Sequence, residues 1–540
     1  MVRGAEQTGL WRRALLGLLL LGASVWAQPQ PMPKEPEKKE PEKKEPLTLE
    51  ELTRRVIELE ATNRQLMERL DGNNRTNGMG NDTPAISGTP EQLQNQENRP
   101  FYEIVDSPVP DYTEERFFPR SVPQVPSPGV KNPERLPLNV SFGPGFLFQS
   151  TRSDFSLQIH YESQVEYREW RKGDQIPAND GFFLPRQRFF FNGTITKPLE
   201  YEISLNRGLG GVNILNAYLN YHASDEFEFR VGRFFTPFTH DQYAVSNYWL
   251  ITPERSVFTT NLSPNRQFGA MAWGYLLDKK LDYALGVFNG SRNSFEDPDG
   301  NRDVVGFVNT RPFQDMEHLP ALRFLNLGAS ATFGRQNQSP SPTSFRIGGG
   351  SPDTNIPGNA TVPFLILQPD VSEQGDRFLA SIHAAYYYKG LSLIGEYQFG
   401  YGHYAGNRST STRVPFNGYY VAAGYFLTGE EVERRTRLRP LRPVFPVNKD
   451  EERGWGAWEL AGRVANLQIG DEVFTAGFAD RSIWSNSVTT TEVGVNWYLN
   501  EYIKIYCFWL NGRFGDPVQY RPGRATQSTD MFWLRAQLYF

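Results

Sequence analysis

Five arginines occupy alternating positions in strand-like segments, on the side that also carries the other polar residues. They are Arg186, Arg188, Arg230, Arg463 and Arg535. A guanidinium group offers planar, forked donors that suit phosphate and carboxylate oxygens, so a file of them could replace the hydration of an anion. The same polar faces carry Glu162, Glu166, Glu200, Glu202, Glu396, Glu459 and Glu492. Two interpretations therefore stay open: an anion-binding lining, or arginine–glutamate pairs that stiffen a protein wall.

No motif for catalysis or for a bound cofactor accompanies these charges. The six histidines are scattered, without HExxH or the paired spacing of a zinc site. The nearest approach to a nucleophile elbow, around Ser330, lacks its second glycine, and no Gly-Lys-Ser/Thr loop is present. We therefore predict neither an enzyme nor a metal or cofactor protein. A formal net charge of −5 also gives no indication of a nucleic-acid partner.

Alternating segments of about ten residues recur from residue 138 to the end of the chain, as in transmembrane β-strands. In residues 155–169, for example, Val165 and Tyr167 share one face, and Glu166 and Arg168 share the other. Counting from residue 155 predicts about sixteen strands. Short turns alternate with long polar loops, which favours an all-β, antiparallel transmembrane β-barrel over a large soluble sandwich. Such a barrel must close, because an open edge would leave unpaired backbone groups in lipid.

Aromatic residues are frequent near the strand ends. We expect them to form girdles at the two membrane interfaces. These residues are Trp273, Tyr275, Trp455, Trp458, Trp497, Tyr498, Tyr502, Trp509 and Trp533.

A connection of unusual length, residues 236–265, follows the fifth predicted strand and carries Pro237, Pro253 and Pro264. Long structureless loops are uncommon in compact domains and are usually functional. We expect this loop to fold into the mouth of the barrel and to determine which solutes pass through it. Its candidate constriction residues are Thr236, His240, Tyr243, Tyr248, Glu254 and Asn265.

The region before the barrel reads as four segments. Residues 1–27 resemble a signal peptide, with arginines before a short apolar run. Residues 28–47 form a Pro/Glu/Lys spacer, residues 48–71 a coiled-coil helix, residues 72–137 a linker, and residues 138–540 the barrel. The helix seam, with an asparagine that fixes register, consists of Leu49, Leu52, Val56, Leu59, Asn63, Leu66 and Leu70. Self-association is the favoured interpretation; docking of the amphipathic helix elsewhere is the alternative.

Several segments, in their order along the chain, resemble the phosphate-selective porin O and P family. They are residues 186–194, 230–238, 251–274, 281–290, 418–430, 456–467 and 492–505. The resemblance implies a trimeric, sixteen-stranded channel in the outer membrane, narrowed by an inward-folded third loop and lined by basic residues that bind anions. That loop would be residues 236–265, with Arg255 and Arg266 at its distal end. The resemblance also implies that the terminal Phe540 is the signal read by the barrel-assembly machinery.

We therefore predict a passive, water-filled channel in the outer membrane for small hydrophilic solutes, including anions such as phosphate. The predicted partners are the lipid bilayer, two further copies of the chain and the barrel-assembly machinery, and the N-terminal arm is expected in the periplasm. The alternative is a structural barrel with a plugged lumen, which anchors the membrane to the periplasm or cell wall through the coiled-coil arm.

Overall fold

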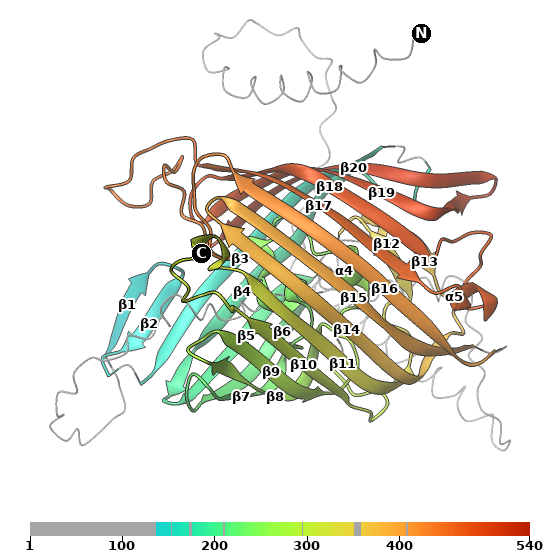
Figure 1. Ribbon diagram of the computed structural model, residues 1–540, viewed down its shortest axis with the longest axis horizontal. Helices are drawn as coiled ribbons and strands as arrows, with labels where there is room; N and C mark the ends of the chain where they lie inside the picture. The colour runs from blue at the N-terminus through green and yellow to red at the C-terminus, as the bar shows by residue number, and fades with distance from the viewer. Residues whose placement is uncertain are drawn as a thin grey trace, which may run out of the picture. The chain divides into compact units, whose positions relative to one another are not determined.

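The computed structural model describes residues 137–152, 154–171, 175–208, 211–293, 295–349, 358–406 and 409–540. Within them, eighteen strands form one antiparallel sheet, made of a hairpin, β1–β2, and sixteen strands that close on themselves (Figure 1). The closure is made by β20 against β3, from Asp530 opposite Arg171 to Tyr539 opposite Glu162. The prediction of sixteen strands and a closed barrel is confirmed.

The wall strands are β3 (Ser156–Arg171), β4 (Gly181–Thr196), β5 (Leu199–Gly208), β6 (Gly211–His222), β7 (Glu228–Phe235), β8 (Arg266–Leu276), β9 (Leu281–Phe288), β10 (Asp303–Thr310), β11 (Asn326–Gln338), β14 (Ser372–Tyr388), β15 (Leu391–Gly406), β16 (Ser409–Phe426), β17 (Ala457–Ile469), β18 (Ser487–Tyr498), β19 (Ile503–Arg521) and β20 (Arg524–Tyr539). Each wall strand is hydrogen-bonded, antiparallel, to the next wall strand along the chain.

Burial along the wall strands is the reverse of that in a soluble sandwich. The outward residues Val165, Phe189 and Val421 are 42%, 47% and 51% exposed, whereas the inward Glu166 and Arg188 are 1% and 0% exposed. An apolar outer surface is stable only against lipid, and buried charges need partners inside the protein. The two faces of each strand therefore separate a lipid side from a polar interior, as the alternation predicts.

The two ends of the barrel differ in their connections. One end, here the turn end, carries the tight links 197–198, 277–280, 389–390 and 499–502. The other, the loop end, carries the longer connections 236–265, 289–302, 339–371 and 470–486. Two connections at the turn end are also long: residues 311–325, and residues 427–456, which we name the turn-end segment.

A short hairpin extends the wall beside the seam. It consists of β1 (Leu138–Phe142) and β2 (Phe146–Ser150), and β2 pairs with the part of β3 that lies beyond the end of β20. The last residue, Phe540, packs there, with its ring centroid 5.9 Å from Phe142 and 6.2 Å from Phe146. The hairpin thus covers the end of the closing strand.

Other elements lie off the wall. The short helices are η1 (His240–Ala244, a π-helical turn), η2 (Asn247–Trp249), α4 (Val257–Leu262), η3 (Pro320–Leu322), η4 (Gly358–Ala360) and α5 (Glu472–Thr475), and the second sheet pairs β12 (Ser344–Ile347) with β13 (Val362–Ile366). Among the residues that the structure describes, no helix has both the length and the apolar character to cross a membrane. The predicted signal peptide, spacer, coiled coil and most of the linker lie outside these residues.

Candidate functional site

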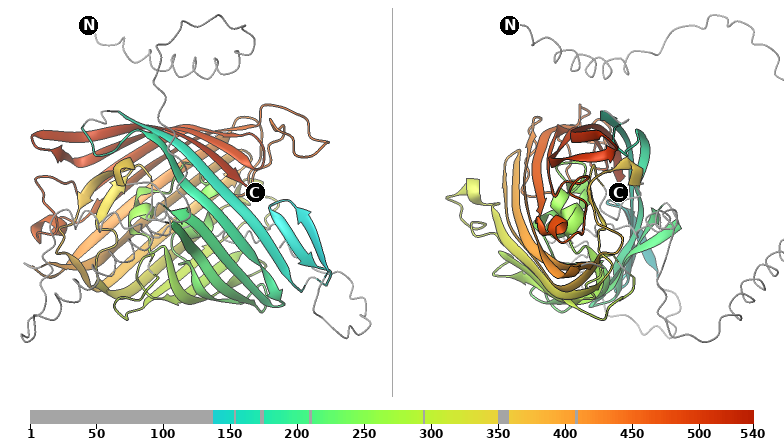
Figure 2. Two further views of the ribbon diagram at one scale, coloured as in Figure 1. Left: turned by 180° about the vertical axis from the view of Figure 1, so that it is seen from behind. Right: turned by 90° about the vertical axis from the view of Figure 1, so that its right-hand side faces the viewer.

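Residues 236–265, here the inserted loop, lie inside the barrel (Figure 2). The loop leaves β7 and returns to β8, yet its backbone is bound by strands on the far wall. Asn496 donates to the carbonyl of Ile251 at 2.8 Å, and Lys504 donates to that of Leu250 at 2.9 Å. On another part of the wall, Ser330 accepts from the amide of Thr239 at 2.9 Å. The loop therefore spans the interior from one wall to the other.

Local contacts close the base of the inserted loop. The amide and the hydroxyl of Thr236 both donate to the carbonyl of Asn265, at 3.0 and 2.9 Å. Asn265 has φ of 65°, a conformation that asparagine tolerates better than most residues. Ser256 caps α4 by accepting from the amide of Thr259, which matches the preference of serine for this position. These contacts fix the bends at which the chain turns into the interior.

Glu254 is the main charged anchor of the inserted loop. Arg186 donates to its two carboxylate oxygens at 2.6 and 2.8 Å, and Arg535 donates to it at 2.6 Å. Burial alone would raise the pKa of Glu254, but the two arginines outweigh burial and hold that pKa well below the usual value of a glutamate. Arg535 also pairs with Glu166 at 2.7 Å. The carboxylate thus ties the loop to β4 and β20.

A second anchor lies at the other end of the inserted loop. Glu396 of β15 accepts from the backbone amides of His240 and Asp241, at 2.8 and 3.2 Å. His240 also packs on His383, with ring centroids 4.7 Å apart. Burial lowers the pKa of His240 to about 4, so the imidazole is neutral at pH 7. This end of the loop is therefore held through its backbone by a wall carboxylate.

The structure places all seven predicted arginines in the interior, but in different surroundings. Four pair with glutamates: Arg186 with Glu254, Arg188 with Glu162, Arg463 with Glu492, and Arg535 with Glu166 and Glu254, at 2.6 to 3.2 Å. Arg255 donates to the carbonyl of Val245 at 3.0 Å. Arg230 and Arg266 lie over the rings of Tyr218 and Phe235, at 4.2 and 3.7 Å. Arg188, Arg463 and Arg535 thus pair with wall glutamates, as one of the two interpretations has it, whereas Arg186 pairs with a glutamate of the inserted loop.

The six predicted constriction residues all belong to the inserted loop but contact different walls. Tyr248 stacks on Tyr539 of β20 with ring centroids 4.0 Å apart. Tyr243 meets the edge of Phe307 of β10 at 5.0 Å. Thr236 and Asn265 close the base, while His240 and Glu254 are the two anchors described above. The predicted set is therefore distributed along the loop and does not form one cluster.

Sequence reasoning missed a second element in the interior, at the loop end. We name β12, β13 and the adjoining residues 348–349 and 358–361 the loop-end hairpin (Figure 1). Arg346 and Asn261 exchange two hydrogen bonds at 2.9 and 3.0 Å, and Tyr520 donates to the carbonyl of Pro363 at 2.6 Å. Gly349 has φ of +88°, and a Cβ there would lie 2.8 Å from Arg168, so only glycine allows this approach. The apolar run at residues 362–367 was the available signal.

The turn-end segment also contributes a side chain to the interior of the barrel. Arg435 donates to the two carboxylate oxygens of Glu459 at 2.6 and 3.2 Å, and to the carbonyl of Trp249 in the inserted loop at 3.0 Å. The sequence signal was the arginine-rich stretch at residues 434–442, but it does not show which arginine enters the barrel.

The prediction that these aromatic residues form interfacial girdles is partly wrong. Trp273, Tyr275, Tyr498 and Trp533 are 3%, 8%, 4% and 1% exposed, because they point into the barrel. Trp455 and Trp509 are 81% and 45% exposed and lie on the outside. The indole nitrogens of Trp458 and Trp497 both donate to the carbonyl of Trp455, at 3.0 and 2.7 Å. Position near a strand end therefore does not decide which face an aromatic residue occupies.

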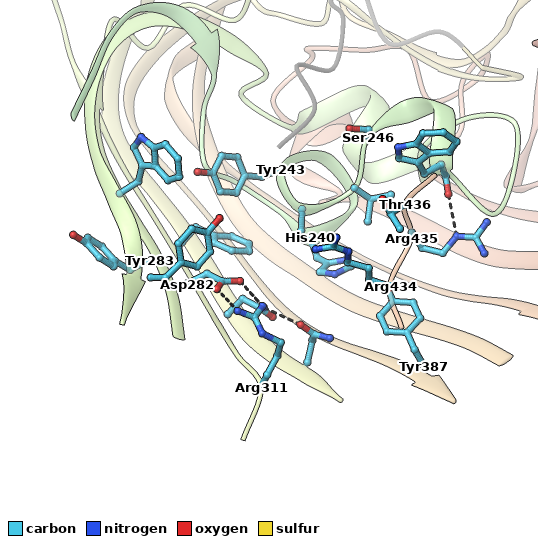
Figure 3. A pocket seen from close by; sticks show the side chains of 18 of the residues that line it. His240, Tyr243, Ser246, Asp282, Tyr283, Arg311, Tyr387, Arg434, Arg435 and Thr436 are labelled. Atoms are coloured by element: carbon cyan, nitrogen blue, oxygen red, sulfur yellow. Dashed lines mark hydrogen bonds and ion pairs between the residues drawn. The ribbon is translucent and has the colours of Figure 1, made fainter. Parts of the chain in front are cut away.

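Two cavities border the inserted loop. One of about 150 Å³ lies between the loop, the turn-end half of β8 to β11 and residues 434–436 (Figure 3). The other, of about 20 Å³, lies where the loop meets the loop-end hairpin, with Arg255, Arg346 and Arg463 in its lining. Among the described residues, no group of three or more histidine, cysteine or acidic side chains could hold a metal ion.

A closed, sixteen-stranded wall with a polar interior and a loop folded into it is the architecture of outer-membrane porins. The family described as phosphate-selective porin O and P matches residues 157–540, and the chain belongs to this family. Family and fold support an outer-membrane channel rather than an enzyme.

Individual relatives match less of the chain or have low sequence identity to it. Porin O of Pseudomonas aeruginosa is 30% identical over 100 residues, which span 18% of this chain and 22% of Porin O. The anion-selective porin from Comamonas acidovorans is 13% identical, with a TM-score of 0.43 over 72% of this chain and 100% of that one. The outer-membrane channel DcaP of Acinetobacter baumannii is 10% identical, with a TM-score of 0.44 over 73% and 99%.

Proposed function

We propose that this protein is a passive outer-membrane channel for small hydrophilic solutes, with a preference for anions, and that the inserted loop limits what passes. The observation that carries the proposal is the loop itself, which spans the interior and is bound to opposite walls. Membership of the phosphate-selective porin O and P family supports the preference for anions.

The charged side chains of the interior also support a preference for anions, but only a moderate one. Arg463 and Arg255 are linked, since Arg463 donates to the backbone carbonyl of Arg255 at 2.9 Å, and both line the small cavity beside the loop. Glu254 and Glu492 line that cavity too. Guanidinium groups shared with carboxylates offer a solute fewer donors, so we expect anion preference to be moderate.

The test is ion selectivity in planar lipid bilayers. The purified full chain, held in a KCl gradient, should conduct with a reversal potential on the anion side. Arg255→Gln and Arg266→Gln keep hydrogen-bond donors but remove charge, and each should move the reversal potential towards the cation side. Arg453→Gln, at an exposed position of the turn-end segment, is the matched control and should leave it unchanged. Unaltered selectivity in both test variants would contradict the role given to Arg255 and Arg266.

A structural barrel with a plugged lumen is the second candidate, and a specific observation favours it. The inserted loop is contacted from the loop end through Asn261 and from the turn end through the carbonyl of Trp249. Absence of any current from correctly folded protein, at voltages at which porins conduct, would favour this candidate over the channel.

Assembly adds further proposals. We propose a homotrimer gathered by the coiled coil of residues 48–71, with the N-terminal arm in the periplasm, and Phe540 as the residue read by the barrel-assembly machinery. Phe540 supports this proposal only by its position at the end of β20, where its amide donates to the carbonyl of Tyr161 at 3.2 Å. Cross-linking of the full chain and of a chain beginning at residue 88 tests the trimer: only the full chain should cross-link efficiently.

A further inference from the structure

The inserted loop contacts the two sides of the barrel interior differently. On one side, residues 248–255 follow the wall formed by β17 to β20. The carbonyls of Tyr248, Leu250 and Ile251 accept hydrogen bonds from side chains of β20, β19 and β18, at 3.1, 2.9 and 2.8 Å. Arg463 of β17 donates to the carbonyl of Arg255 at 2.9 Å. Because the loop is hydrogen-bonded to all four strands, we name this the closed side.

On the opposite side, a cavity of about 150 Å³ separates the first half of the loop from the turn-end half of β8 to β11. Figure 3 shows Asp282 and Arg311 on one side of the cavity and His240 and Arg434 on the other. The lining residues at the turn end are half-buried and include Tyr283, Arg311, Arg434 and Thr436. The cavity therefore reaches the surface of the protein at the turn end.

Aromatic side chains make up most of the cavity wall. Tyr243 and Trp249 come from the inserted loop, Trp273 and Tyr275 from β8, Phe307 from β10 and Tyr387 from β14.

The charged side chains of the cavity already have partners. Asp282 binds Arg311 at 2.7 Å, and Arg435 binds Glu459 at 2.6 Å. Arg434 also has an interaction partner. Charges that are engaged with each other have less effect on a passing ion. We therefore expect this cavity to discriminate between solutes by size more than by charge.

We propose that solutes pass the turn end of the barrel through this cavity, here the aromatic outlet, and that Tyr243 sets the largest size of solute that passes. Tyr243 extends from the loop to the wall, where it meets Phe307 edge to face with ring centroids 5.0 Å apart, a favourable geometry. The inference rests on the proposed function, because an outlet requires that the barrel conducts. It deepens that function by naming the route and the residue that limits solute size.

The volume of the aromatic outlet indicates the size of solute that it holds. An engineered apolar cavity of about this volume in another protein accepts one benzene molecule. The outlet therefore holds a solute of about the size of one six-membered ring at a time. A monosaccharide should pass it faster than a disaccharide does.

The route is tested by blocking the outlet with a reagent that attaches to a cysteine. Cys507→Ser removes the one native cysteine, which lies half-buried on the outer face, and Ala244→Cys then places a thiol in the outlet lining. Benzyl methanethiosulfonate is uncharged and adds a ring to that thiol. Single-channel conductance in planar bilayers should lose most of its value after the reagent and recover after dithiothreitol. Conductance that the reagent leaves unchanged would overturn the proposed route.

Ala461→Cys in the same background is the matched control. Ala461 lies on the inner face of β17, between Glu459 and Arg463, and is 4% exposed on the closed side. The reagent should leave its conductance unchanged, because the loop covers this wall. Equal block of the two cysteine variants would show that the route is not confined to the aromatic outlet and would also overturn the proposal.

The role of Tyr243 is tested by swelling of lipid vesicles that contain the purified full chain, with glucose and maltose as separate probes. Tyr243→Ala removes the ring that narrows the outlet and should raise the rate for maltose relative to that for glucose. Tyr397→Ala, at a position 46% exposed on the outer face, is the control and should leave the ratio as in the native chain. An unchanged ratio in Tyr243→Ala would contradict its role.

Far-ultraviolet circular dichroism checks the fold of each variant. The outcomes for the channel and for the outlet are distinguishable. A folded native chain that shows neither current nor swelling defeats the proposed channel and the outlet with it. Current in the native chain that persists in the modified Ala244→Cys variant defeats the outlet alone.

Discussion

The inserted loop and the loop-end hairpin both occupy the interior of the barrel, but they are held by different kinds of contact. The loop is held through carboxylates: Glu254 binds two wall arginines, and Glu396 binds two backbone amides of the loop. The hairpin is held by apolar burial, with Phe345, Val362 and Phe364 at 1%, 0% and 0% exposed, and by hydrogen bonds to its carbonyls. Arg168 donates to the carbonyl of Ala360 at 3.0 Å, and Tyr520 donates to that of Pro363.

This difference indicates what each element would lose if its contacts to the wall were broken. Removing one partner of a buried ion pair leaves an uncompensated charge. Displacing the inserted loop from the wall would therefore have a large free-energy cost. A neutral hydrogen bond can be exchanged for one to water at a net cost of about 1 kcal/mol. We therefore infer that buried ion pairs hold the inserted loop in the interior, whereas apolar burial and hydrogen bonds hold the loop-end hairpin there.

The largest effect should come from Glu254→Ala. The change removes the Glu254 carboxylate that pairs with Arg186 and one of the two carboxylates that pair with Arg535, and loss of one member of a buried pair costs about 3–5 kcal/mol. Urea unfolding of the barrel in lipid vesicles measures the free energy of unfolding. Glu452→Ala is the control, since its side chain is 77% exposed, and it should change that free energy by about 1 kcal/mol or less. Equal effects of the two changes would contradict the inference that buried ion pairs hold the loop.

A pH series should separate the ionic anchor from the rest of the fold. The pKa of Glu254 is lower in the folded chain than its unfolded value of about 4.3. Its contribution to stability is therefore complete above about pH 4.3 and is lost as the pH falls through the folded pKa. The difference in unfolding free energy between the native chain and Glu254→Gln should be constant from pH 7 to about 5 and shrink below. A difference that grows on acidification would show that the carboxylate is not stabilised in the folded state.

The smallest effect should come from Tyr520→Phe, which removes only the hydroxyl that donates to Pro363. We expect the unfolding free energy to fall by about 1 kcal/mol. Hydrogen exchange at the backbone amides of β12 and β13 should nevertheless become faster, because the hairpin loses one of its contacts to β19. If this variant lost as much stability as Glu254→Ala, the two elements would be held with similar strength and the comparison would fail.

Much of the wall could be predicted because apolar and polar residues alternate consistently along its long strands. Segments such as β3 and β20 repeat the pattern over enough residues to show both the strand and its faces, including Val165 outside and Glu166 inside. The position of the inserted loop followed from counting strands. Its contacts did not, because Glu254 meets Arg535 across 281 residues and no local pattern contains that pairing.

The loop-end hairpin and the inward aromatic residues show where local patterns stop being informative. The strands β12 and β13 are four and five residues long and are bounded by glycine and proline, so they offer little periodicity. Trp273 and Tyr275 alternate correctly, but aromatic residues suit either face of this barrel, where Arg230 lies 5.0 Å from the ring of Trp273. Which face they occupy depends on register against β7 and β9, and that is a property of the assembled sheet.

The most direct test of the central claim is single-channel conductance of the native chain beside a chain in which residues 240–262 are replaced by a short Gly/Ser linker. We predict that the native chain conducts, and that removal of the inserted loop raises the conductance. Equal conductance in the two chains, or no current from either one in a folded state, would contradict the account.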